Sequence, residues 1–159
     1  MADIVEYCLG WEEFHRDSRI LAARLLGDAR GGRWRELVCI TRGGLVPGGI
    51  LARELDMRRV ETLCLASYDH TRQGDMQILK GIEGDGDGLL IVDDLVDTGG
   101  TARLVREQLP AATLVAVYAK PRGKPLVEHY AREFEQHVWL HFPWDNDLRF
   151  SPPLASGTL

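Results

Sequence analysis

The 159-residue chain has few cysteines, no long apolar run and no basic stripe, and each absence excludes a class of protein. Cys8, Cys39 and Cys64 form an odd set without the spacing of metal ligands, which indicates reduced thiols rather than a disulfide framework or a zinc site. No apolar run approaches the ~18 residues that a membrane span needs, so we expect no integral membrane segment. The acidic start MADIVEYCLGWEE lacks a signal-peptide pattern, and we therefore expect a cytoplasmic protein.

The charge balance argues against a nucleic-acid partner. The formal net charge is −5, and no stretch interleaves basic and aromatic side chains as nucleic-acid-binding surfaces do. A small polyanion is still compatible with this charge, because a few local Arg and Lys side chains can hold it. With 45% hydrophobic and 27% charged residues, the chain resembles ordinary globular proteins, and its length predicts one domain, residues 1–159.

Alternating strand and helix signals predict an α/β fold with a mostly parallel central sheet flanked by helices. We expect strands at residues 36–41, 59–67, 89–92, 113–119 and 138–142, and helices at 11–26, from the turn holding Pro47 to about Leu55, and at 102–109. Residues 68–88 are polar, contain five glycines and show no clear periodicity. So long a loop within a compact domain is usually functional, which predicts a flexible loop that covers an active site.

The segment LLIVDDLVDTGGT, residues 89–101, carries the clearest functional signal. Its apolar run predicts a strand buried on both faces, with Asp93 and Asp94 at the carboxyl end, where open α/β sheets bind ligands. The glycines and threonines at 98–101 then open a helix, where backbone N–H groups, hydroxyl groups and the helix dipole favour an anion. The carboxylates would instead accept hydrogen bonds from hydroxyl groups or bind Mg²⁺. Phosphate, diol and Mg²⁺ together describe a ribose 5-phosphate.

Two other interpretations of this segment stay open. In an ordinary strand-to-helix turn, Asp97 or Thr98 would only cap the helix. A phosphoacceptor receiver domain also clusters aspartates with a Thr and a Lys, but its acidic pair follows the first strand, whereas here the pair comes past the middle of the chain. A ribose-phosphate site explains the apolar strand, the acidic pair and the glycine-threonine turn in one register.

Residues 89–101 resemble the phosphoribosyl-pyrophosphate (PRPP) motif of the type I phosphoribosyltransferases. The resemblance extends over residues 11–153 to the type I purine phosphoribosyltransferase family, in particular to the bacterial xanthine-guanine enzymes. The further segments that carry it are TRGGLVPGGILAREL at 41–55, SYDH at 67–70, KP at 120–121 and WLHFPWD at 139–145.

This resemblance implies the type I phosphoribosyltransferase fold with a small hood built from terminal segments. It implies a purine salvage enzyme that transfers the 5-phosphoribosyl group from PRPP to N9 of a 6-oxopurine (guanine, xanthine, more weakly hypoxanthine), giving GMP, XMP or IMP and pyrophosphate. It further implies Mg²⁺ as cofactor, a homotetramer or homodimer, and peripheral association with the inner membrane. A hypoxanthine-guanine-type enzyme stays open as an alternative, as does a nucleotide-sensing regulatory protein, although this acidic chain lacks the basic face expected of an RNA-binding regulator.

The PRPP motif would supply the ribose site and the catalytic group. By the resemblance, Asp93 and Asp94 would hold the ribose hydroxyl groups, and Asp94 would also contact Mg²⁺. Asp97 would take or give the purine N7 proton and is the implied catalytic residue. The residues implied to bind the ribose and its 5-phosphate are Asp93, Asp94, Asp97, Thr98, Gly99, Gly100 and Thr101.

A second anion site must hold the departing pyrophosphate. Thr41, Arg42 and Gly43 lie where a predicted strand meets a glycine-rich turn, so that Arg42 supplies charge and the turn supplies backbone N–H groups. The resemblance implies a cis peptide between Thr41 and Arg42. Relatives carry a pyrophosphate-binding arginine where this chain has Gly74, and we expect Arg72, two residues earlier, to replace it.

Purine binding is implied for Asp97, Lys120, Trp139 and Leu140. Lys120 would donate to the 6-oxo group, which favours 6-oxopurines over adenine because an exocyclic amine cannot accept that hydrogen bond. Trp139 would stack on the ring, and Leu140 would offer backbone contacts to the 2-substituent. Without the resemblance, Lys120 would be a solvated lysine and Trp139 a half-buried core aromatic.

Overall fold

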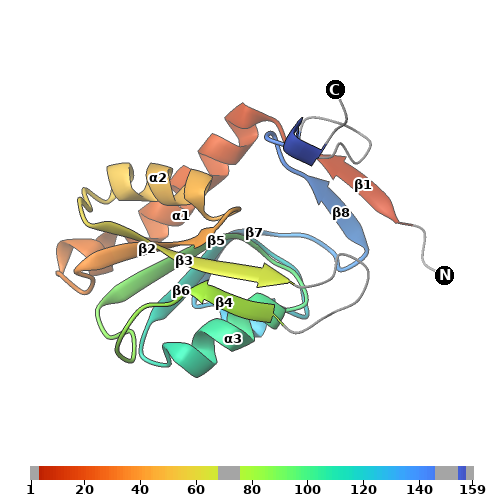
Figure 1. Cartoon of the computed structure of the whole chain (residues 1–159). Coiled ribbons are helices and arrows are strands. Elements are labelled where there is room, and N and C mark those ends of the chain that lie inside the picture. Colours follow the sequence, from red (N-terminus) through yellow and green to blue (C-terminus); the bar gives the residue numbers. More distant parts are fainter. Residues whose placement is uncertain (1–3, 68–75, 146–153, 157–159) are drawn as a thin grey trace.

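The computed structural model describes residues 4–67, 76–145 and 154–156, which form a six-stranded central sheet and a separate two-stranded sheet (Figure 1). The central strands lie in the order β4-β3-β2-β5-β6-β7. Their bounds are β2 Glu36–Thr41, β3 Val60–Ser67, β4 Met76–Lys80, β5 Leu89–Val96, β6 Thr113–Ala119 and β7 His129–Glu133. The other elements are β1 Val5–Cys8, β8 Val138–His141, α1 Trp11–Arg30, α2 Leu45–Glu54, α3 Gly100–Gln108 and the short 3-10 helices η1 Lys124–Leu126 and η2 Leu154–Ser156.

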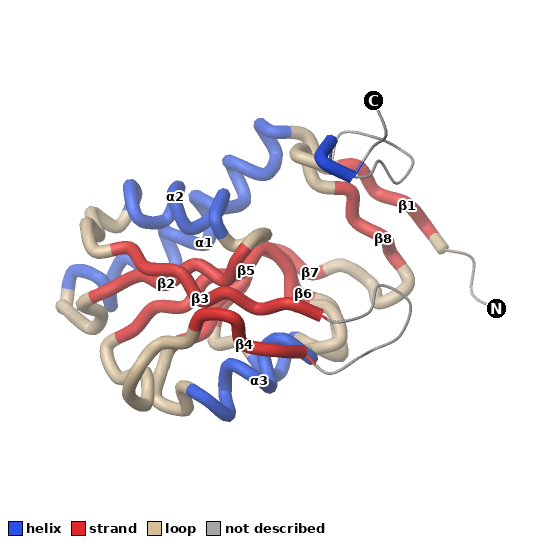
Figure 2. Tube along the Cα trace, in the orientation of Figure 1, coloured by secondary structure: helices blue, strands red, loops and turns tan. Residues whose placement is uncertain are grey.

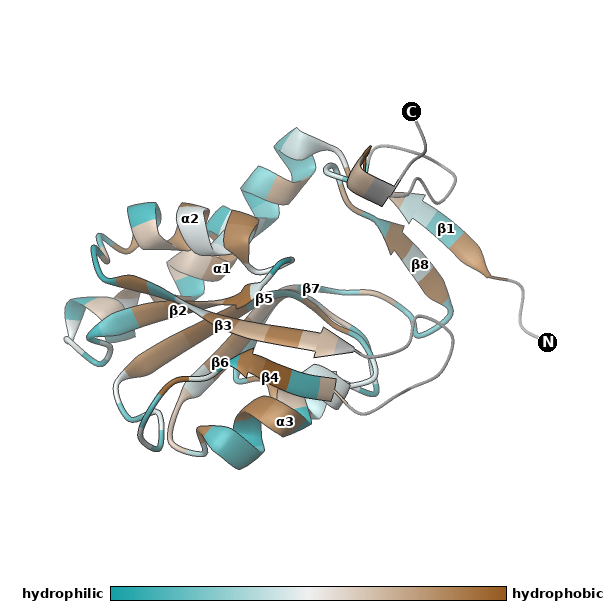
Figure 3. Ribbon diagram, in the orientation of Figure 1, coloured by the Kyte–Doolittle hydropathy of each residue, from teal (hydrophilic) through white to brown (hydrophobic). Residues whose placement is uncertain are grey.

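Helices cover both faces of the central sheet, with α1 and α2 on one face and α3 on the other (Figure 2). Strands β2, β3, β5, β6 and β7 are parallel, and only the edge strand β4 pairs antiparallel. Every residue of β6, TLVAVYA, is buried, as expected for a strand enclosed on both faces. Hydrophobic residues accordingly concentrate along the central strands (Figure 3). The predicted α/β architecture with a mostly parallel sheet is confirmed.

Helix α1 packs on the sheet through an apolar stripe that includes Phe14, Leu21 and Leu25, all fully buried. Trp11 lies at the first residue of the helix and is 55% exposed. Asp17 is buried although it is acidic, and it accepts a hydrogen bond from the Tyr118 hydroxyl group at 3.0 Å. A polar partner within the sheet thus makes its burial tolerable.

Among the described residues, no helix is both long and apolar enough to cross a membrane.

The prediction of a structureless loop over residues 68–88 is wrong for part of that range. Residues 76–80, MQILK, form β4, which pairs with β3 at the edge of the sheet. Only one face of β4 packs on the core, through Ile78, so the apolar signal within it is too short to recognise from the sequence. Residues 68–75 lie outside the described residues, and the expectation of a flexible cover there stays a prediction.

Strands β1 and β8 form a small parallel sheet apart from the central one, in register from Val5 opposite Val138 to Cys8 opposite His141 (Figure 1). This sheet is the hood expected from the two terminal segments. One ion-pair cluster ties it to the core: the Tyr7 hydroxyl group donates to Glu13 Oε1 at 2.8 Å, and Arg132 on β7 donates to the same oxygen at 2.6 Å. Strand β8 had been predicted, whereas β1 and β7 had not.

Replacing Glu13 by Gln is expected to lower the free energy of unfolding by about 1 kcal/mol at pH 7. Burial opposes ionisation of Glu13, but hydrogen bonds from Tyr7 and Arg132 and the charge of Arg132 outweigh it and lower the pKa of this carboxyl. A lowered pKa stabilises the folded state above the ordinary value of 4.5, and this contribution disappears as the pH falls through the lowered value. Urea unfolding at several pH values measures the effect.

Glu12→Gln is the matched control, because Glu12 lies in the same first turn of α1 and is exposed. An equal loss of stability in both variants would show that the helix dipole, and not the link to the hood, accounts for the effect.

Candidate active site

Two glycine-rich turns meet at one edge of the central sheet. Strands β2 and β5 are parallel neighbours, so their carboxyl ends lie together, and each end leads through a turn into α2 or α3. A Cβ atom on Gly43 would collide with the Asp94 carboxylate, only 2.7 Å from Oδ1. The structure therefore brings the sequence-predicted pyrophosphate turn against the predicted ribose-binding pair.

The turn after β2 has the backbone that the resemblance implies. The peptide between Thr41 and Arg42 is cis, which confirms that expectation. Gly44 packs so tightly that a Cβ atom would collide with the carbonyl oxygens of Val92 and Ile40. The side chain of Arg42 is exposed and thus accessible to an anion. Arg72, the fourth residue predicted for this site, lies outside the described residues.

The acidic pair lies within β5, not after it as predicted. The strand continues to Val96 because Asp93 and the residues from Leu95 onwards still pair with β6. Asp93 Oδ1 accepts the N–H of Asp94 at 2.9 Å, and Asp94 Oδ1 accepts the N–H of Leu95 at 2.7 Å. These bonds to the adjacent backbone orient both carboxylates near the carboxyl end of β5, the end at which open α/β sheets bind ligands.

Ionisation of both carboxylates of this pair is unfavourable in the folded protein. Burial raises the pKa of Asp93 well above its usual range, and the negative charge of Asp94 raises it further. Burial also raises the pKa of Asp94, although the hydrogen bond from the Leu95 N–H opposes this. A cation or a set of hydroxyl donors beside the pair would stabilise its charged form. The pair is therefore suited to a ligand of that chemistry.

Replacing Asp93 by Asn is therefore expected to raise the free energy of unfolding at pH 7 to 8 by about 1 kcal/mol. A raised pKa destabilises the folded state as the pH rises above the ordinary value of 3.8, so the gain should grow with pH and vanish below that value. The Asn side chain keeps an oxygen for the Asp94 N–H, so the local geometry is retained. Thermal unfolding of both proteins between pH 3.5 and 8 tests this; a gain that does not depend on pH would contradict the electrostatic explanation.

The turn before α3 has the features of an anion site. Gly99 adopts a left-handed conformation with φ 87° and is the N-cap residue, and no side chain in the described part of the chain makes the capping hydrogen bond. The N–H groups of the first helical turn therefore lack an intrahelical acceptor, and this end of the helix dipole is positive. Thr101 Oγ1 contacts Met76 Sδ of β4 at 3.7 Å. The interpretation of Asp97 or Thr98 as a mere helix cap is thus wrong.

Asp97 is held by two side chains from distant parts of the chain. Lys120 Nζ lies 2.9 Å from Asp97 Oδ2, and Gln136 Nε2 donates to Asp97 Oδ1 at 2.6 Å. The Lys120 side chain is only 3% exposed, so it is not a solvated lysine, whereas the Asp97 side chain is 39% exposed and accessible to a ligand. Sequence reasoning missed Gln136, because no local motif marks it.

The two remaining purine-binding candidates lie in the hood. Trp139 on β8 is 58% exposed, which contradicts a core role and leaves its ring accessible for stacking. Leu140 is buried at 7% exposure, so its side chain packs into the core rather than facing a ligand. Gln136 lies in the turn that leads into β8 and thereby connects this strand to Asp97.

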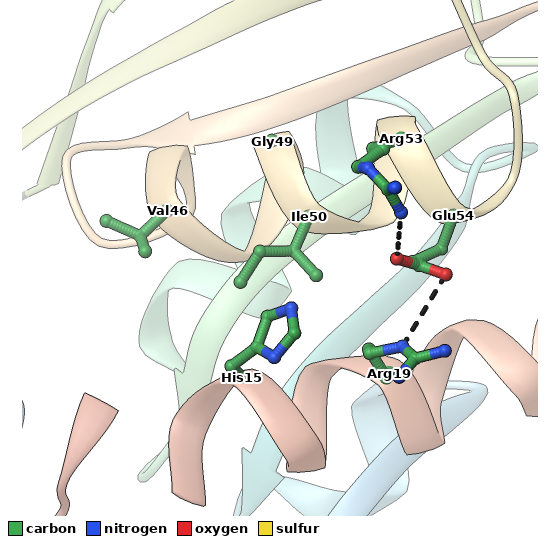
Figure 4. Close-up of a pocket in the computed structure, with 7 residues that line it drawn as sticks. All are labelled: His15, Arg19, Val46, Gly49, Ile50, Arg53 and Glu54. Atoms are coloured by element: carbon green, nitrogen blue, oxygen red, sulfur yellow. Dashed lines mark hydrogen bonds and ion pairs between the residues drawn. The ribbon is translucent and has the colours of Figure 1, made fainter. Parts of the chain in front are cut away.

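A hollow of about 590 Å³ also lies between α1 and α2 (Figure 4). One carboxylate partly offsets its positive charge: Glu54 lies 2.7 Å from Arg53 Nη1 and 3.6 Å from Arg19 Nε. The hollow therefore offers an anion less net positive charge than its two arginines suggest, and we assign it no part in the site at the edge of the sheet.

Residues 10–151 match the model of the phosphoribosyl transferase domain. The chain belongs to this family. The match replaces the receiver-domain interpretation and explains why both glycine-rich turns converge on an acidic pair.

Solved structures of this phosphoribosyltransferase fold are similar over nearly the whole chain. A purine phosphoribosyltransferase from Pyrococcus horikoshii has 24% identity and a TM-score of 0.75, covering 93% of this chain and 99% of its own. The xanthine-guanine-hypoxanthine phosphoribosyltransferase of Helicobacter pylori has 26% identity and a TM-score of 0.70, covering 90% and 96%. A hypothetical protein from Neisseria gonorrhoeae with bound ppGpp has 18% identity and a TM-score of 0.68, covering 94% of each chain. These likenesses establish the type I phosphoribosyltransferase fold.

The acidic pair Asp93 and Asp94 is the candidate metal-binding feature at this edge of the sheet. Within residues 4–67, 76–145 and 154–156, no group of three or more His, Cys, Asp or Glu side chains is placed to hold a metal ion. Mg²⁺ commonly binds through one or two carboxylates together with substrate phosphates and water. The Asp93 and Asp94 pair, unfavourable when charged and unliganded, fits that mode of binding.

Proposed function

We propose that the protein is a purine salvage enzyme that transfers the 5-phosphoribosyl group of PRPP to N9 of a 6-oxopurine. Guanine and xanthine would be the main acceptors and hypoxanthine a weaker one, giving GMP, XMP or IMP and pyrophosphate. The observation that carries this proposal is the pairing of buried Lys120 with accessible Asp97 directly before the anion-binding turn of α3. In this proposal, Lys120 is the donor for an oxo group and Asp97 the acceptor for a ring proton, on one side of a ribose-phosphate site.

The two turns bind different parts of PRPP. The first-turn N–H groups of α3, with residues 98–101 (Thr98, Gly99, Gly100 and Thr101), bind the 5-phosphate. Asp93 and Asp94 accept hydrogen bonds from the ribose hydroxyl groups. Across the edge of the sheet, the residues of the other turn, Thr41, Arg42 and Gly43, hold the pyrophosphate together with Arg72.

In the reaction, N9 of the purine forms a bond to C1 of the ribose while the bond from C1 to the pyrophosphate oxygen breaks. Positive charge develops on the ribose ring, and the negative charges of Asp93 and Asp94 stabilise it. Arg42 stabilises the negative charge that develops on the leaving pyrophosphate. The proton on purine N7 moves to Asp97, whose carboxylate is accessible.

Mg²⁺ fits this site through Asp94 and the oxygens of PRPP. When bound, it would neutralise charge on the pyrophosphate. We propose the metal as part of the active enzyme.

Lys120 would select the purine. Its ammonium group can donate to a 6-oxo group but not to the 6-amino group of adenine. Trp139 would stack on the ring, and the backbone of Leu140 would contact the 2-substituent. In support, the H. pylori enzyme of similar structure is named for xanthine, guanine and hypoxanthine. We also propose a cytoplasmic homodimer or homotetramer, with peripheral attachment to the inner membrane as a further property.

An assay of pyrophosphate release with PRPP, Mg²⁺ and each purine in turn tests the proposal. We expect turnover with guanine, xanthine and hypoxanthine, and at least ~100-fold lower kcat/KM with adenine. Comparable turnover of adenine would contradict the role of Lys120. Nucleotide binding without turnover of any purine would instead favour a sensing protein, as the similar fold with bound ppGpp suggests.

A further inference from the structure

Gln136 contacts the Asp97 carboxylate, as Lys120 does, although it lies 39 residues away from Asp97 in the sequence. Its Nε2 donates to Asp97 Oδ1 at 2.6 Å, and its Oε1 accepts the backbone N–H of Arg122 at 3.0 Å. Gln136 thus bridges Asp97, which lies in the turn between β5 and α3, and the turn that follows Lys120.

These two partners determine which way the amide points. A backbone N–H can only donate and a carboxylate can only accept, so Oε1 must face Arg122 and Nε2 must face Asp97. If the amide were flipped, its NH2 group would face the Arg122 N–H and its oxygen would face the Asp97 carboxylate, so neither hydrogen bond could form. Gln136 is therefore a fixed, neutral donor to Asp97 and does not compete with it for a proton.

Lys120 is the charged partner of Asp97, and its buried ammonium group is the one proposed to reach the purine 6-oxo group. When Lys120 turns toward the purine, its contact with Asp97 Oδ2 weakens or is shared. The hydrogen bond from Gln136 to the other oxygen does not depend on the purine. It keeps the carboxylate in place at the moment when the N7 proton is to be accepted.

We propose that Gln136 is a positioning residue that orients the Asp97 carboxylate while Lys120 engages the purine. This inference rests on the proposed function. Because Gln136 lies in the turn before β8, it also couples Asp97 to the strand that carries Trp139. Gln136 thereby fixes the position of Asp97 relative to β8, the strand that carries Trp139.

Two substitutions separate the orienting role from a structural one. Gln136→Leu removes both hydrogen bonds and is expected to lower kcat with guanine about tenfold, while KM for PRPP changes less than about threefold. Gln136→Glu keeps the acceptor for the Arg122 N–H but sets a second carboxylate against Asp97. We expect it to move the acid limb of the kcat/KM profile for guanine up by about one pH unit, because two adjacent carboxylates resist being charged together.

Glu135→Leu is the matched control, because Glu135 is the preceding residue and its side chain is 79% exposed. It should leave kcat and the pH profile unchanged. If the wild-type enzyme is active and both Gln136 variants show the same kcat and the same acid limb as the wild type, the positioning role is wrong but the proposed function stands. If Gln136→Leu does not fold, the acid limb of Gln136→Glu alone tests the positioning role. A wild-type protein that releases no pyrophosphate with any purine would overturn the proposed function and this inference together.

Discussion

Replacing Asp97 by Asn is expected to lower kcat with guanine by about 100-fold or more, the usual contribution of a general acid or base. The amide has nearly the same shape but cannot take the N7 proton. It also has a single oxygen, so it can accept from Lys120 or from Gln136 but not present an oxygen to both, as Asp97 does at 2.9 and 2.6 Å. Steady-state kinetics at saturating PRPP measures the loss.

The same variant should bind PRPP almost normally. Asp97 contacts the base in this account more than the pyrophosphate, so KM for PRPP is expected to change less than about fivefold. A fall in kcat of less than about threefold would show that Asp97 is structural. An equal loss in binding and turnover would place it in PRPP binding instead of proton transfer.

Replacing Gly43 by Ala is expected to lower kcat/KM for PRPP by about 100-fold, because a displacement of about 1 Å in a catalytic site can cost that much. The added Cβ would lie 2.6 Å from Asp94 Cγ and 2.7 Å from Asp94 Oδ1, so either the carboxylate or the turn must move. Both belong to the proposed site, one beside the ribose and Mg²⁺ and the other around the pyrophosphate. Initial rates at varied PRPP report the change.

Gly49→Ala provides the control. Gly49 lies in α2, shortly after the same turn, and a Cβ atom there would meet no atom within 4 Å. Alanine within a helix is more stable than glycine by roughly 0.5–1 kcal/mol, so this variant should be slightly more stable and fully active. If Gly43→Ala were as active as Gly49→Ala, the close approach of the two turns would have no part in catalysis.

The sequence predicted those strands best that are buried on both faces. The bounds of β2 and β6 are confirmed to the residue, because each is a continuous apolar run bounded by turn residues. Strands β1, β4 and β7 were not predicted, since each has four or five residues that are mostly not buried. Such strands depend on a partner strand that the local sequence does not reveal.

Site features that lie within one segment of the sequence could be predicted, whereas contacts between distant segments could not. The PRPP motif lies in one continuous segment, so its strand, acidic pair and turn were recognisable, although β5 continues past the acidic pair because β6 extends beside it. The bond from Gln136 to Asp97 and the packing of Gly43 against Asp94 join segments far apart in the chain. Only the sheet order brings these residues together. The one available sequence signal for Gln136 was its place just before the strand that carries Trp139.

The stoichiometry of the reaction is the sharpest test of the proposed phosphoribosyl transfer. The purified protein is incubated with PRPP, Mg²⁺ and guanine, and PRPP, pyrophosphate and nucleotide are quantified over time. We predict one pyrophosphate and one N9-linked guanosine 5-monophosphate for each PRPP consumed, with none formed when PRPP is omitted. Stable PRPP in the presence of guanine, xanthine and hypoxanthine alike, or pyrophosphate released without any nucleotide, would contradict the account.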